Sequence, residues 1–243
     1  MSNAARPLDL PLPAGVDGCA DPQFAAAVRG FARIFRGRDS NRRRVGGAGL
    51  AVRLNGVPVV DIWTGYADAE RATPWTRDTG ALLFSATKGI AATVIHRLAD
   101  RGLLSYDAPV ADYWPEFAAN GKSRITVRQV LTHRAGLAGL NSVAHSMADI
   151  LDHRLMERRL AAAAPDRLLG LPAYHAFTFG WLLAGIARGV TGKDMAELFQ
   201  AEVAAPLGVD GLHLGLPPAG SGTVAAPLIG THLRATHLAD LHP

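Results

Sequence analysis

A serine and a lysine three positions apart have the residue types needed to cleave an acyl bond. Ser85, Ala86, Thr87 and Lys88 read S-x-x-K, and on a helix residues i and i+3 share one face, so the hydroxyl and the amine can meet. A serine hydroxyl is a weak nucleophile until a nearby base takes its proton. An amine can be that base when burial lowers its pKa, because desolvation disfavours the ammonium form. The spacing therefore predicts Ser85 as a nucleophile and Lys88 as its base.

The same spacing also arises when a serine caps an amphipathic helix and a lysine is exposed one turn later. The neighbours of this pair argue against that alternative. Leu82, Leu83 and Phe84 precede Ser85, and small or apolar residues follow Lys88. An ammonium group without a partner is costly in apolar surroundings. This context favours the catalytic interpretation.

The elements that must position these residues begin with a helix and a hairpin. We predict the helix over 22–36, with Asp21 as its cap and a proline at its first position. Two strand-like runs follow, at 48–54 and 57–65. Asn55-Gly56 lies between them and is the strongest short hairpin signal. The N-terminal part of the chain therefore predicts sheet with one helix.

The remainder is predicted to be mostly helical. A helix over 85–101 carries the serine and the lysine on one face. Thr126 and Gln129 form a capping-box pattern that opens another helix, which ends near Gly136. His133 then lies late in that helix, where its charge suits the helix dipole. The further predicted elements are helices at 147–164, 177–191 and 194–204, the last stopped by Pro206, and a short strand at 212–214.

Composition places the chain among ordinary globular proteins, with 49% hydrophobic and 19% charged residues. We divide it into an extended lead-in (1–20), one domain (21–217) and an irregular tail (218–243). No run of about 18 apolar residues is present, so we expect no membrane span. The N-terminus lacks a secretory pattern, and the single cysteine, Cys19, excludes an intramolecular disulfide. We therefore expect a cytoplasmic protein.

Two clusters suggest other kinds of partner. Arg42 to Arg44 form the one dense basic run of a chain with a formal net charge of +4, and such runs can bind nucleic acid. No aromatic residues are interleaved with it, so we interpret it as a solvated turn. His232, His237 and His242 could suggest a metal, but no carboxylate or cysteine pattern accompanies them. We predict no nucleic-acid partner, no metal and no cofactor.

Several stretches, in order, resemble the serine beta-lactamase-related family, which includes class C beta-lactamases, D-Ala-D-Ala carboxypeptidases and family VIII carboxylesterases. They are Phe84–Ile90, Leu104–Val110, Tyr113–Phe117, Ile125–Leu137 and Tyr174–Leu182. The resemblance covers about 48–217. It implies an α+β fold of the beta-lactamase/transpeptidase type, with the N-terminal hairpin and the helical region present and the C-terminal sheet strands missing.

The resemblance also implies a third catalytic residue. The family's second motif is Tyr-x-Asn, whose tyrosine helps to activate the serine and to reprotonate the leaving group. It maps onto Tyr174-His175-Ala176. Alanine replaces the asparagine whose amide helps to hold the acylamido group of penicillins, so the chain resembles the esterase-like branch more closely. Tyr174 could instead be a half-buried structural tyrosine. His175 could assist proton transfer, although we interpret it as a local hydrogen-bonding residue.

The reaction that the resemblance implies is two-step acyl transfer on a small ester or amide. Ser85 attacks the carbonyl, Lys88 and Tyr174 move the proton, and water hydrolyses the acyl-enzyme. One oxyanion donor is the Ser85 N–H, and the other would come from a C-terminal strand beside a third motif such as Lys-Thr-Gly. We identify no such motif after Tyr174. We predict an esterase-like serine hydrolase that is truncated. The alternatives are a beta-lactamase or D-Ala-D-Ala peptidase, and a catalytically inactive remnant.

Overall fold

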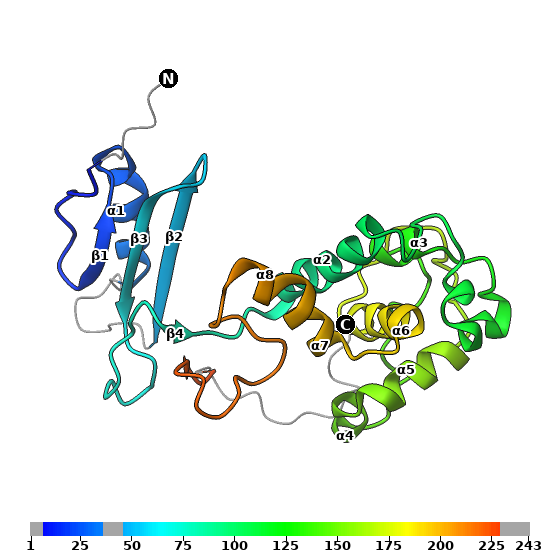
Figure 1. The fold of residues 1–243 in the computed structure, drawn as a ribbon. Coiled ribbons are helices and arrows are strands. Elements are labelled where there is room, and N and C mark those ends of the chain that lie inside the picture. The colour runs from blue at the N-terminus through cyan, green and yellow to red at the C-terminus, as the bar shows by residue number, and fades with distance from the viewer. Residues whose placement is uncertain (1–6, 36–45, 229–243) are drawn as a thin grey trace. The chain divides into compact units, whose positions relative to one another are not determined.

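The structure is a computed structural model that describes residues 7–35 and 46–228 (Figure 1). The described residues form two compact units. The first contains the chain up to Leu82 and a segment that begins at Pro217, and the second runs over Leu83–Leu216. All three residues predicted to be catalytic lie in the second unit. The Arg42–Arg44 cluster and the three histidines of the tail lie outside the described residues.

A three-stranded antiparallel sheet in the order β1-β3-β2 organises the first unit. Its strands are β1 (Val16–Ala20), β2 (Gly47–Leu54) and β3 (Val57–Gly65). The predicted hairpin is confirmed, because Asn55 and Gly56 join β2 to β3 with φ of 50° and 78°. Positive φ at both central residues is typical of the tight turn that fits twisted strands. β1 lies inside the expected lead-in, so part of that segment belongs to the sheet.

One helix packs on this sheet. Its predicted cap is confirmed, since the Asp21 carboxylate accepts a hydrogen bond from the Gln23 N–H at 2.8 Å. A 3-10 turn, η1 (Pro22–Phe24), leads into α1 (Ala25–Phe35). The apolar core joins one face of α1 to the two strands β1 and β3. Its buried members are Val16, Ala20, Val28, Phe31, Ala32, Val60 and Ile62. A short parallel pair, β4 (Thr79–Gly80) and β5 (Val224–Ala225), also belongs to this unit.

Helices build the second unit around α6. The elements are η2 (Phe84–Ala86), α2 (Thr87–Asp100), η3 (Val110–Asp112), η4 (Pro115–Gly121), α3 (Val127–Leu131), α4 (Met147–Leu151), α5 (His153–Ala162), α6 (Thr178–Thr191), α7 (Met195–Phe199), η5 (Gln200–Ala204) and α8 (Ala205–Leu207). Both α2 and α5 pack against α6, which is buried from Thr178 to Ala187 except at Gly180 (Figure 1). Its sequence is apolar on nearly every face, as a central helix requires.

Three predicted elements differ from the structure. The helix predicted over 147–164 is two helices, because Asp152 leaves the helical region and caps α5 by accepting a hydrogen bond from the Leu155 N–H. The helix predicted to stop at Pro206 continues to Leu207 through a π-helical turn, which places the proline at the start of α8, where its missing N–H is tolerated. Residues 212–214 form no strand.

The capping box at Thr126 is confirmed, with Gln129 as its partner, but α3 ends at Leu131, well before Gly136. His133 lies beyond the helix, so the prediction that its charge serves a helix end is wrong. Among the residues that the structure describes, no helix combines the length and the apolar character that crossing a membrane requires.

Candidate active site

The serine and the lysine of the S-x-x-K motif are in contact. Ser85 lies in the 3-10 turn η2, and Lys88 lies in the first turn of α2, which follows directly. The Lys88 Nζ donates a hydrogen bond to the Ser85 Oγ at 3.1 Å. Phe84, the residue before the serine, has a φ of 47°, a left-handed conformation that is strained for a bulky side chain. The strained turn lies directly before the proposed nucleophile.

The surroundings of this pair are more open than the sequence predicted. Ser85 is exposed and Lys88 is half-buried, because the apolar residues before the serine do not cover the amine. Leu83 and Phe84 are 46% and 61% exposed. The described residues therefore bring the two groups together while Lys88 stays partly exposed.

Tyr174 completes the cluster, as the family resemblance implied. The Lys88 Nζ lies 5.0 Å from the centre of the Tyr174 ring. Hydrogen bonding to Ser85, then to Lys88, together with the charge of Lys88, holds the pKa of the Tyr174 phenol below its usual value. Such contacts favour the phenolate over the phenol. With 55% of its surface exposed, Tyr174 is not the half-buried structural tyrosine of the alternative interpretation.

His175 has a local role. Its ring is fully buried. Its Nδ1 donates to the Ala173 carbonyl at 2.7 Å, and its Nε2 accepts from the Leu137 N–H at 3.3 Å. These contacts occupy both nitrogens of the neutral ring. Burial lowers the pKa of His175, although the hydrogen bond to the Ala173 carbonyl acts in the opposite direction. His175 therefore ties the Tyr174 segment to the chain after α3, and it is the local hydrogen-bonding residue that we interpreted it to be.

One segment of the sequence has the form of the third motif that we did not identify. His213-Leu214-Gly215 reads His-x-Gly. These residues lie in an irregular stretch and form no strand, whereas the resemblance places the second oxyanion donor on a strand. The His-x-Gly spacing alone therefore does not supply that donor.

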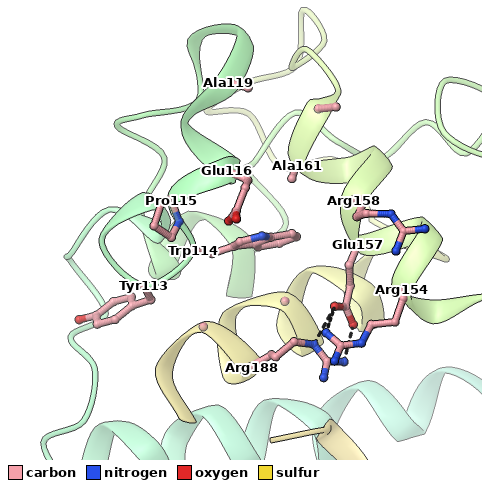
Figure 2. Close-up of a pocket in the computed structure, with 13 residues that line it drawn as sticks. Tyr113, Trp114, Pro115, Glu116, Ala119, Arg154, Glu157, Arg158, Ala161 and Arg188 are labelled. Atoms are coloured by element: carbon pink, nitrogen blue, oxygen red, sulfur yellow. Dashed lines mark hydrogen bonds and ion pairs between the residues drawn. The ribbon is translucent and has the colours of Figure 1, made fainter. Parts of the chain in front are cut away.

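A pocket of about 680 Å³ lies elsewhere in the second unit, beside α5 and α6 (Figure 2). Trp114 and Glu116 line one side. Opposite them, the Arg188 guanidinium forms hydrogen bonds to both carboxylate oxygens of Glu157, at 2.9 and 3.0 Å. The lining contains no serine, threonine, cysteine, lysine or histidine, so it offers no nucleophile paired with a base. Within the described ranges, no group of three or more histidine, cysteine or acidic side chains could hold a metal ion.

Comparison with known proteins identifies the family of the chain. A family model described as Beta-lactamase matches residues 25–234. The chain belongs to the beta-lactamase family. It is 59% identical over 214 residues to "Esterase/beta-lactamase LipL" of Mycobacterium tuberculosis, an alignment that covers 88% of the chain and 48% of that protein. It is 34% identical to "Esterase EstB" of Burkholderia gladioli, in an alignment that covers 69% of this chain and 46% of that protein.

Solved structures of this family confirm the predicted beta-lactamase/transpeptidase-like α+β fold. A penicillin-binding protein homolog from Caulobacter crescentus superposes with a TM-score of 0.77 at 38% identity, covering 88% of this chain and 56% of that one. A family VIII carboxylesterase superposes with a TM-score of 0.76 at 41% identity, covering 88% of this chain and 57% of that one. The chain thus spans about half the length of the relatives it matches.

Proposed function

We propose that this chain is the part of an esterase-like serine hydrolase that carries the nucleophile. The observation that carries the proposal is the contact of Lys88 with Ser85 at 3.1 Å, beside the Tyr174 ring. An isolated serine hydroxyl does not attack esters, and it is activated by an adjacent group that takes its proton. The cluster supplies two such groups.

The proposed reaction begins with attack of the Ser85 Oγ on the ester carbonyl carbon. Its proton passes to the cluster of Lys88 and Tyr174. The lowered pKa of Tyr174 supports the phenolate as acceptor, with the Lys88 ammonium balancing its charge. The tetrahedral intermediate collapses, and the alcohol leaves with that proton. Water then attacks the acyl-Ser85 ester by the same route, which releases the acid and restores the hydroxyl.

The proposed substrate class is small carboxylic esters. The names of LipL, an esterase/beta-lactamase, and EstB, an esterase, support this choice. So does Ala176, which replaces the amide that the family resemblance assigns to lactam recognition. Beta-lactam hydrolysis is the second candidate, because the name of LipL includes it. Turnover of nitrocefin with no turnover of p-nitrophenyl butyrate would favour this second candidate.

A fluorophosphonate probe tests the nucleophile, because it labels activated serines covalently. We expect one adduct, on Ser85, and none in Ser85→Ala. Ser142→Ala is the matched control, since that hydroxyl only donates to the Gly139 carbonyl within its own turn. Labelling that persists in Ser85→Ala would refute the nucleophile. Intact-mass measurement with p-nitrophenyl acetate tests the inactive-remnant alternative, which predicts no acyl adduct.

Three further proposals accompany this function. Residues 21–217 are the hydrolase domain, the protein is cytoplasmic, and it binds no nucleic acid. Cell fractionation tests the location. A mobility-shift assay with DNA at low salt tests the last proposal, because binding through an arginine cluster is strongest there.

A further inference from the structure

His133 lies beside the proposed catalytic tyrosine. Its ring centre is 5.0 Å from that of Tyr174, 5.5 Å from that of His175 and 4.7 Å from that of Phe179. Its backbone has a φ of 60°, in the left-handed region that is uncommon for residues other than glycine, although histidine, asparagine and aspartate adopt it more often than the rest. Such conformations persist where the surrounding structure holds them, often at functional sites.

Two hydrogen bonds join His133 to the residues on either side of Tyr174. The Ala173 N–H donates to the His133 carbonyl at 2.9 Å. The His175 N–H donates to the His133 Nδ1 at 3.2 Å. The tyrosine therefore projects from a backbone segment that is fixed at both flanks by one residue.

We propose that His133 is a positioning residue, which holds the Tyr174 phenol against Ser85 and Lys88 through its ring and its Nδ1 acceptor. The proposal rests on the proposed function. Tyr174 is more than half exposed, so general burial does not fix its side chain. Contacts with His133 and Lys88 therefore restrict it. A displacement of about 1 Å in a reacting group can lower a rate about 10²-fold.

The Nδ1 of His133 can accept a hydrogen bond only in the neutral ring, whose proton is then on Nε2. The surroundings favour that form. Burial, then His175, then Lys88 lower the pKa of His133. The titratable groups that face it are Lys88, His175 and Tyr174.

Two amide variants of His133 test whether the hydrogen-bond acceptor at the position of Nδ1 is what matters, as distinct from the rest of the side chain. His133→Asn places an amide oxygen near the position of Nδ1 and tolerates positive φ. His133→Gln carries the same amide one methylene further out, near Nε2. His96→Ala is the matched control, because His96 contacts Tyr106 through a 2.9 Å hydrogen bond and a 5.6 Å ring contact in the same unit.

The direct measurement is the titration of Tyr174 by NMR with ¹³Cζ-tyrosine. The chain has four tyrosines, and Tyr174→Phe assigns the resonance. In His133→Gln we expect the Tyr174 pKa to rise toward the ordinary value of about 10 and the rate of fluorophosphonate labelling to fall about 10²-fold. His133→Asn keeps the wild-type titration and labels within about tenfold of wild type, and His96→Ala changes neither.

An unchanged Tyr174 titration in His133→Gln would overturn the proposal, as would a His133→Asn variant that behaves like His133→Gln. A shift of Tyr174 in His96→Ala would also overturn it, because it would show a general loss of structure. Absence of labelling in the wild type refutes the proposed function instead, and the NMR titration still tests the placement of Tyr174.

Discussion

Lys88 contacts the serine and the tyrosine at once, and its two possible tasks differ in charge. As a general base it must be neutral. As the counter-ion of a Tyr174 phenolate it must be charged. The contacts of Tyr174 with Ser85 and Lys88 lower the pKa of its phenol, which is the effect that the second task would use. Substitutions that keep or remove the charge can separate these two tasks.

We expect Lys88→Met to lower the rate of fluorophosphonate labelling by about 10²–10⁴-fold, the usual contribution of a positioned proton-transfer group. Lys88→Arg keeps the charge but cannot lose its proton. A counter-ion role predicts that Lys88→Arg retains at least about ten times the labelling rate of Lys88→Met, whereas a base role predicts equal losses. Lys193→Met, at an exposed lysine, is the control and should label at the wild-type rate.

The two histidines of the site make stability depend on pH. Burial is the first cause that lowers the pKa of His175 and of His133 in the folded protein. The unfolded chain therefore binds more protons than the folded one below the ordinary histidine pKa of about 6.5. The part of the free energy of unfolding that depends on these neutral histidines is fully present above that pH. It is lost as the pH falls toward their lowered pKa values in the folded protein.

Urea unfolding at pH 7 and pH 5.5 measures this effect, and we expect a smaller free energy of unfolding at pH 5.5. His175→Asn should reduce the difference between the two pH values, while His96→Ala, at an exposed histidine, should leave it unchanged. An equal pH difference in the wild type and in His175→Asn would contradict the assignment to His175.

At the scale of elements, α6 depends on glycines where other segments approach it. A Cβ at Gly185 would lie 2.2 Å from the Trp114 ring, whereas a Cβ at Gly180, in the same helix, would meet nothing within 4 Å. The ring of Trp114 is held by its own packing against Phe117, at 5.4 Å between centres. Moving the ring away from α6 would disturb this contact.

This pair of glycines gives opposite predictions for one substitution. Gly185→Ala should destabilise the protein by about 1–3 kcal/mol, because the added Cβ would overlap the Trp114 ring and force that ring to move. Gly180→Ala should be neutral or stabilise by up to about 1 kcal/mol, because alanine is the better helix former. Chemical denaturation with far-UV circular dichroism measures both. Equal changes in the two variants would contradict the close packing of Trp114 on α6.

At the scale of the whole molecule, the chain spans about half of its relatives. Among the described residues, β2 pairs only with β3, so its other edge presents unpaired backbone groups. The family resemblance assigns the second oxyanion donor to a C-terminal strand, and His213-Leu214-Gly215 does not form one. In the proposed mechanism the Ser85 N–H is one oxyanion donor, and the segment with the His-x-Gly spacing provides no strand for the second.

We therefore expect this chain alone to hydrolyse p-nitrophenyl butyrate about 10²–10³-fold more slowly, in kcat/KM, than a full-length relative, which is the usual effect of losing one oxyanion donor. Titration with the fluorophosphonate probe measures how much of each protein carries a reactive Ser85 or its equivalent. The kcat/KM of each protein is then calculated per reactive serine. A kcat/KM equal to that of the relative would show that a second donor is present in this chain.

Features whose causes lie within one or two turns of chain could be predicted from the sequence. The hairpin at Asn55-Gly56, the cap at Asp21 and the capping box at Thr126 are all observed, because side chains and turn residues act on their own neighbouring backbone. The contact of Ser85 with Lys88 also belongs here, since helical spacing produces it. The family resemblance, not the local spacing, supplied Tyr174.

The way in which the Tyr174 segment reaches Ser85 and Lys88 depends on contacts between segments that are far apart in the sequence. His133 adopts a left-handed backbone and holds the Tyr174 segment from both flanks, and no local pattern predicted either feature. The sequence also overestimated the burial of Lys88, which is only half-buried, because apolar neighbours in sequence need not cover a side chain in space. Such placements depend on contacts between remote segments, whose free energy is a sum over the whole fold and not over one stretch of residues.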